Sequence, residues 1–216
     1  MENLPDPPLL IVMLGTLGVM PFLIVMGTSF VKLVVVFGLV RNALGIQSIP
    51  PNIAIHGLAL ILTVYIMMPV ALETYDHLVA QNVTYDNLEE IGASFSGVLA
   101  PYKEFLVRHA GENHVDFFVE TASTLWGEAR QQELSRDNLF VLIPAFVVGE
   151  LTSAFAIGFL IYLPFIVIDL IISNILLAMG MMMMSPITIS LPLKLLLFVF
   201  LDGWEQLVQG LILSYQ

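Results

Sequence analysis

The 216-residue chain has no cysteine and few charged residues. Without cysteine it can form neither disulfides nor thiolate metal sites. Lysine and arginine number only seven against 18 acidic residues, so the net charge is −11. This balance argues against nucleic acid as a partner, because phosphate binding needs clustered basic side chains. Charged residues make up 12% of the chain, against about 25% in an average soluble domain.

Motifs for nucleotide binding and hydrolysis are also missing from the sequence. It contains no P-loop, no glycine-rich dinucleotide motif and no GxSxG nucleophile motif. His56, His77, His109 and His114 do not have the spacing of a metal site, and there is no HExxH. We therefore expect no cofactor, no metal and no enzymatic activity.

What the chain does contain is apolar side chains. They make up 58% of the residues, and the mean hydropathy is +0.91. This composition predicts an integral membrane protein made of helices. The first residues, MENLPDPP, carry acids and prolines where a signal peptide would carry basic residues, so we expect this segment to be retained.

Charge divides the chain into three blocks. Residues 1–72 and 139–216 are mainly hydrophobic, and each is predicted to form a helical hairpin. Residues 73–138 hold 12 acids and four bases, a net charge of −8, and are predicted to form a small, mainly helical insert. An apolar stripe from Val115 to Trp126, at helical spacing, predicts an amphipathic helix there.

Prolines and glycines predict where the apolar blocks turn or break. Gly45, Pro50 and Pro51 predict a turn within residues 42–52, followed by a span over residues 53–72. Residues 9–40 are too long for one span, so either Pro21 and several glycines break the helix or the helix projects out of the bilayer. The last block is predicted to form either two full spans or several shorter, broken ones, and its prolines are Pro144, Pro164, Pro186 and Pro192. The lone Arg41 predicts that the 42–52 turn is cytoplasmic and that the acidic insert lies outside.

Four ionisable residues lie within the apolar segments: Lys32, Glu150, Asp169 and Lys194. Such residues mark either an ion or proton pathway or structural ion pairs between helices, and the many helix breakers favour ion pairs. For Lys32, the alternatives are snorkelling at a helix end and pairing with a carboxylate such as Asp169. A repeat of small residues predicts close helix packing, and it consists of Ala145, Gly149, Ser153, Ala154 and Gly158.

Four consecutive methionines precede Ser185 and Pro186: Met181, Met182, Met183 and Met184. Proline directly after the run predicts a bend there. Flexible thioether side chains suit both a packed gap and an adaptable apolar constriction in a pore, and the run by itself leaves both interpretations open.

Two long segments resemble the signatures of the SctR/FliP family of type III secretion export apparatus proteins. The first is TSFVKLVVVFGLVRNALGIQSIPPNIAIHGLALILTVYIMMPV, residues 28–70. The second is LIPAFVVGELTSAFAIGFLIYLPFIVIDLIISNILLAMGMMMMSPITISLPLKLLLFVFLDGW, residues 142–204. The resemblance is specific because of the motifs that the segments combine. The first segment contains RNALG followed by PPN, and the second contains, in order, IDL, GMMM, SP, LP, K and DGW.

The resemblance implies an all-α subunit of packed helical hairpins that assembles into a helical ring or cone, a pentamer in the family. Its implied partners are copies of itself, SctS-like and SctT-like membrane proteins, other export apparatus components and unfolded secreted proteins. The implied place is the bacterial inner membrane, with the assembly projecting to the periplasmic side. The methionine loop of the family, a gasket around the closed channel, maps to residues 181–184. This chain has four methionines where three are expected.

Within the family, the N-terminal segment and the compact acidic insert favour the injectisome branch over the flagellar branch. Two alternatives stay open on sequence grounds. One is a proton or solute transporter built around Glu150 and Asp169, and the other is a scaffold beside the pore.

Overall fold

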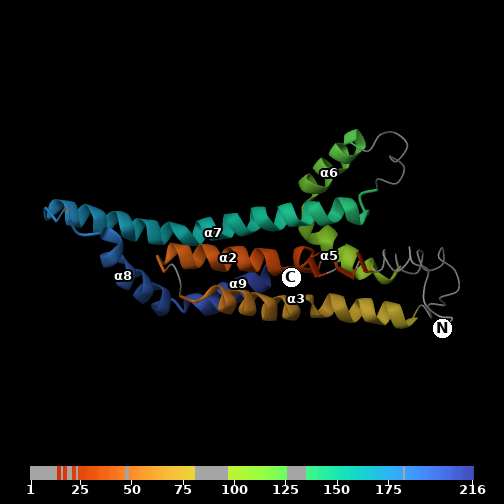
Figure 1. The fold of residues 1–216 in the computed structure, drawn as a ribbon, viewed down its shortest axis with the longest axis horizontal. Helices are drawn as coiled ribbons and strands as arrows, with labels where there is room; N and C mark the ends of the chain where they lie inside the picture. The colour runs from red at the N-terminus through yellow and green to blue at the C-terminus, as the bar shows by residue number, and fades with distance from the viewer. Residues whose placement is uncertain are drawn as a thin grey trace.

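In the computed structural model, the chain forms an elongated bundle of helices (Figure 1). The residues described are 14–15, 17–18, 21–22, 24–46, 49–80, 97–125, 135–181 and 183–216. These residues contain seven named helices and no strand. The all-α fold expected from the composition is therefore confirmed for the described part of the chain.

Helices α2 (Phe30–Ala43) and α3 (Asn52–Ala80) form an antiparallel hairpin in which α2 lies in the middle of the bundle and α3 on the side away from α7 (Figure 1). Its turn falls within residues 42–52, as Gly45 and the two prolines predict. Among the described residues of the 9–40 segment, the helix is interrupted at 27–29, directly before α2, where Gly27 is one of the predicted glycines. Helix α3 continues past residue 72 into the acidic block. Pro69 lies inside this helix and does not end it. The change in composition at residue 72 therefore does not coincide with a helix end.

Helix α7 (Leu139–Ala178) is a single helix of 40 residues that runs the length of the molecule (Figure 1). At about 1.5 Å per residue it is about 60 Å long, twice the thickness of a hydrocarbon core of about 30 Å. Pro144 and Pro164 lie inside it without ending it, so of the two predicted alternatives this part of the block follows the unbroken one. Membrane helices tolerate internal proline where neighbouring groups satisfy the freed carbonyls.

The chain returns from the end of α7 through α8 (Pro186–Phe200) and α9 (Gly203–Leu213). These two helices meet at an angle of 60°. Asp202 takes a left-handed conformation at the bend, with φ 49°. Any side chain at Gly203 would collide with the Phe198 ring, 2.4 Å from the position of its Cβ. The Asp202–Gly203–Trp204 motif thus makes a tight corner, with Trp204 packed edge-on against Phe198.

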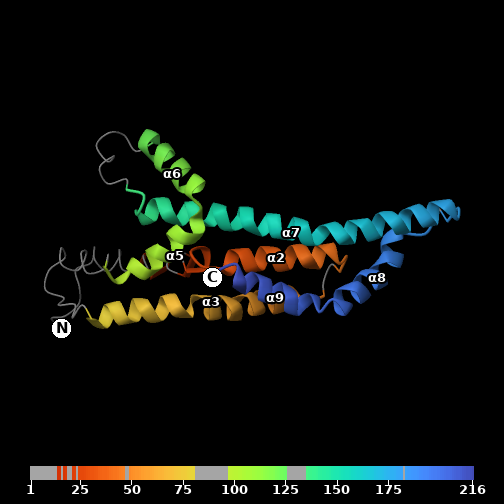
Figure 2. The same ribbon diagram turned by 180° about the vertical axis from the view of Figure 1, so that it is seen from behind.

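The insert contributes α5 (Ala100–Ala110) and α6 (Glu112–Leu125). Both contact the first part of α7, and α6 projects away from the bundle (Figures 1 and 2). The predicted apolar stripe is buried at Val115 and Ala122, but Leu125 is 74% exposed and Trp126 lies outside the described residues. The stripe therefore packs for most of its length but not at its end, where α6 has left the bundle.

Two apolar clusters hold the helices together. The larger joins α2, α3 and α7 to α8 and α9, and Leu207 and Leu211 of α9 pack into it. Figure 2 shows α9 beside α2 and α3. The smaller cluster joins α5, α6 and the start of α7 around Leu106 and Phe146. Within the described residues, α3 and α7 are long and apolar enough to span a membrane, and the bent α8–α9 pair gives a third candidate span.

Candidate functional site

The methionine run forms the loop that follows α7, at the far end of the molecule (Figure 1). Gly180 takes φ +72° just after the helix. Its N–H donates to the carbonyl of Leu177 at 3.0 Å, and the N–H of Met181 donates to that of Leu176 at 2.9 Å. This pair of bonds is a Schellman motif, which ends the helix sharply. Pro186 begins α8 at a position where its missing N–H costs nothing.

Methionine side chains in this loop are exposed to different degrees. Met183 is fully exposed, whereas Met181 and Met184 are 36% and 41% exposed. Met182 lies outside the described residues. The loop therefore presents soft apolar side chains at the end of the hairpin and does not bury them in the core of the subunit.

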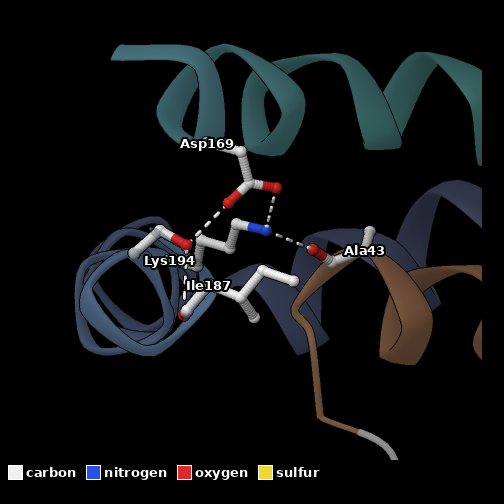
Figure 3. A network of polar contacts seen from close by, with 5 residues as sticks. Ala43, Asp169, Ile187 and Lys194 are labelled. Carbon is white, nitrogen blue, oxygen red and sulfur yellow. Dashed lines mark hydrogen bonds and ion pairs between the residues drawn. The ribbon is translucent and has the colours of Figure 1, made fainter. Parts of the chain in front are cut away.

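A polar cluster lies where α7, α8 and the end of α2 come together, with Lys194 and Ser190 buried and the Asp169 side chain 34% exposed (Figure 3). The Nζ of Lys194 lies 2.6 Å from Oδ2 of Asp169, and Ser190 donates from Oγ to Oδ1 of the same carboxylate, also at 2.6 Å. Lys194 also donates to the carbonyl oxygen of Ala43 at 3.2 Å. Ala43 is the last residue of α2, where unpaired carbonyls and the helix dipole favour a cation. One lysine thus joins the methionine-bearing hairpin to the first hairpin.

A second buried cluster lies further along α7. Lys32 of α2 and Glu150 of α7 form an ion pair with Nζ and Oε1 2.9 Å apart, and their side chains are only 4% and 2% exposed. The hydroxyl of Tyr215, which follows α9, donates to Oε2 of Glu150. The partner of Lys32 is therefore Glu150 and not Asp169, since Asp169 lies in the other cluster beside Lys194.

Aromatic rings surround this second pair. The Nζ of Lys32 lies 4.1 Å from the centroid of the Tyr215 ring. The His109 and Phe105 rings lie 5.1 Å and 6.2 Å from that ring, centroid to centroid. Burial, with the nearby Lys32 and Arg108, lowers the pKa of His109 to about 4, so this imidazole is neutral at pH 7. Burial and the Glu150 carboxylate raise the pKa of Tyr215, so its hydroxyl stays protonated and able to donate.

The small residues predicted to pack helices lie on α7. Ala145 and Ala154 are fully buried, and Ser153 is half-buried. At Gly149 an added Cβ would lie 2.6 Å from the carbonyl oxygen of Ala110 in α5, and at Gly158 it would lie 2.2 Å from a side-chain atom of Leu39 in α2. These two glycines therefore allow α5 and α2 to approach α7 closely.

Sequence reasoning did not identify Ser190 or Tyr215. Ser190 precedes Lys194 by four residues, so both lie on one face of α8, and that spacing was an available signal. Tyr215 lies far from Glu150 in sequence, and no local pattern links the two residues. Within the described part of the chain, no group of three or more metal-ligating side chains comes together.

The chain is similar to known proteins along nearly its whole length. Residues 13–211 match the FliP family. The chain is 57% identical to the Yop proteins translocation protein R of Yersinia pestis, covering 100% of this chain and 99% of that protein. It is 49% identical to the virulence protein YscR of Salmonella typhimurium, over 99% of each chain. It is 43% identical to the hypersensitivity response secretion protein HrcR of Ralstonia nicotianae, over 96% of each. The chain belongs to the FliP family.

Proposed function

We propose that this protein is a pore-forming subunit of the export gate of a type III secretion system, in the injectisome branch. In this role it would pass unfolded substrate proteins across the bacterial inner membrane. The relatives above carry names that refer to translocation, virulence or secretion, which supports the injectisome branch over the flagellar one.

One observation carries the proposal: the exposed methionine loop at the end of a long hairpin. A turn at the tip of α7 and α8 could extend apolar side chains into a shared channel if several copies surround it. Flexible thioethers can adapt to each passing side chain and close again behind it. An apolar constriction of this kind holds back ions by excluding water.

The outer faces of the helices support an assembled state. Large apolar side chains cover α3 and α7, and the exposed ones include Ile61, Tyr65, Phe155, Phe159 and Leu160. Part of such a surface can face lipid, but α7 is about twice the thickness of a bilayer. The remainder needs protein partners, for which we propose further copies of this chain in a ring, SctS-like and SctT-like proteins, and other export apparatus components.

The test is site-specific photocrosslinking from the methionine loop to a secretion substrate stalled in transit. A photoreactive residue replaces Met181, Met182, Met183 or Met184 in turn in the full chain. We expect crosslinks to the substrate from at least one position. The matched control is Phe117 of α6, which is 59% exposed but lies on the projecting helix. Crosslinks from Phe117 and none from the loop would contradict a pore-lining role and favour a scaffold beside the pore.

The alternative of a proton or solute transporter depends on available carboxylates. Each oxygen of Glu150 is already engaged, one by Lys32 and one by Tyr215. Both oxygens of Asp169 are engaged too, by Lys194 and Ser190. Carboxylates held in this way favour a structural role, so we do not propose the transporter function.

A further inference from the structure

Tyr215 contacts the buried Lys32–Glu150 pair and also lines an open groove. The groove has a volume of about 270 Å³ and lies between α3 and α5, and Pro69, Glu73, Glu104, His109 and Tyr215 are among the residues that line it. The Nζ of Lys32 lies 4.1 Å from the centroid of the Tyr215 ring. This one side chain therefore borders both the groove and the ammonium group.

Water exclusion determines the strength of this ion pair. In a region of low dielectric constant the Coulomb attraction is strong, and in water it falls to a small fraction of that value. Glu150 is only 1% exposed, and Lys32 and Tyr215 occupy its two carboxylate oxygens. A path for water from the groove would therefore weaken the link between α2 and α7.

We propose that Tyr215 is a positioning residue that seals the Lys32–Glu150 pair against the groove between α3 and α5. Its ring covers Lys32, and its hydroxyl holds the second oxygen of Glu150. The rings of Phe105 and His109 hold the Tyr215 ring from the α5 side, with Phe105 nearly parallel to it at 17°. Through this one residue, the segment after α9 becomes part of the joint between α2, α5 and α7.

Carboxyl footprinting of the full chain in its solubilised, assembled form tests the seal. A water-soluble carbodiimide with an amine nucleophile labels accessible carboxylates, and mass spectrometry reports the labelling rate of each one. Glu104 lines the same groove and its side chain is 70% exposed, so it serves as an internal standard in every sample. In the parent protein, Glu104 is expected to react and Glu150 is expected to be protected.

Two variants of Tyr215 distinguish the effect of its ring on Glu150 labelling from the effect of its hydroxyl, and a third variant is the control. Tyr215→Ala removes both and should raise the Glu150 labelling rate severalfold, because the reagent can then reach the carboxylate from the groove. Tyr215→Phe keeps the ring and should leave Glu150 largely protected. Leu213→Ala, at an exposed apolar position just upstream, should match the parent.

Two results would overturn the proposal. The first is a Glu150 rate in Tyr215→Ala equal to that of the parent, with Glu104 labelled normally. The second is equal labelling in Tyr215→Phe and Tyr215→Ala, which would assign the protection to the hydroxyl bond alone. If Tyr215→Ala does not assemble, Tyr215→Leu keeps apolar bulk at the position but lacks the flat ring, and it should give a labelling rate above that of Tyr215→Phe. A rate no higher than that of Tyr215→Phe would then contradict a sealing role for the aromatic ring.

Discussion

At the scale of single residues, each buried lysine of this protein has more than one partner. Lys194 contacts the Asp169 carboxylate and a backbone carbonyl at the end of α2. Lys32 contacts the Glu150 carboxylate and the face of the Tyr215 ring. Additional contacts of this kind offset the cost of removing a charge from water, which a lone ion pair often fails to offset.

Removal of one partner from the deeper pair should be strongly destabilising. We expect Lys32→Met to lower the free energy of unfolding by about 3–5 kcal/mol, because it leaves the Glu150 carboxylate buried without its cation. The matched control is Arg108→Ala, which breaks the Glu104–Arg108 pair, whose side chains are 70% and 61% exposed. Breaking such an exposed pair should cost less than about 1 kcal/mol. Denaturant unfolding of the solubilised proteins measures the free energy of unfolding of both variants. Similar losses in the two would contradict a larger stabilising role for the buried Lys32–Glu150 pair.

At the scale of elements, α7 holds the subunit together. It contacts α2, α5, α6 and α8, and two glycines on it allow close approach of its neighbours. The two glycines differ in how well their neighbours could make room for an added side chain. Gly158 faces the end of the Leu39 side chain, which can rotate, whereas Gly149 faces the backbone carbonyl of Ala110, which cannot move by itself.

Substitution of Gly149 by alanine should therefore destabilise the protein even though alanine is the better helix former. Overpacking against a fixed backbone typically costs about 1–3 kcal/mol, more than the gain in helix propensity of about 1 kcal/mol. Gly57 of α3, which has nothing within 4 Å of the added Cβ, is the control. Thermal unfolding should show a lower melting temperature for Gly149→Ala and an equal or higher one for Gly57→Ala. A rise for both would mean that α5 does not pack against α7 as closely as described.

At the scale of the whole molecule, the subunit is long and only partly covered by its own side chains. Its apolar clusters lie between the helices, while the outward faces of α3 and α7 also carry large apolar residues. An exposed apolar surface of this extent marks contact with lipid or with protein. The single chain thus leaves an apolar surface that lipid or protein must cover.

A charge on the outer face of α7 should block assembly without unfolding the subunit. Leu160 is 67% exposed and lies near the middle of the helix, so Leu160→Glu leaves the inner clusters intact. Phe117→Glu places the same charge on α6, where the apolar side chain is 59% exposed. Native gel electrophoresis of detergent extracts should show loss of the assembled complex for Leu160→Glu and its retention for Phe117→Glu. Retention in both variants would argue that this face of α7 contacts only lipid.

Much of this architecture follows from the sequence alone, because it depends on local chemistry. Composition is enough to identify a helical membrane protein, since long continuous apolar segments can satisfy their own backbone polar groups in lipid as helices. Gly45 with Pro50 and Pro51 predicts the first turn, and the methionines before Ser185 and Pro186 predict the second, through backbone preferences at those positions. The two signature segments likewise predict the family.

Tertiary structure decided what local chemistry leaves open. Whether Pro144 and Pro164 break α7 depends on the neighbours of that helix, and here it continues through both. Which carboxylate pairs with Lys32 depends on the register between α2 and α7, which selects Glu150 over Asp169. The contacts of Lys194 with Ala43 and of Tyr215 with Glu150 join residues far apart in the chain. Such contacts carry no local periodicity, because they arise only when whole helices pack, and for that physical reason only the folded structure reveals them.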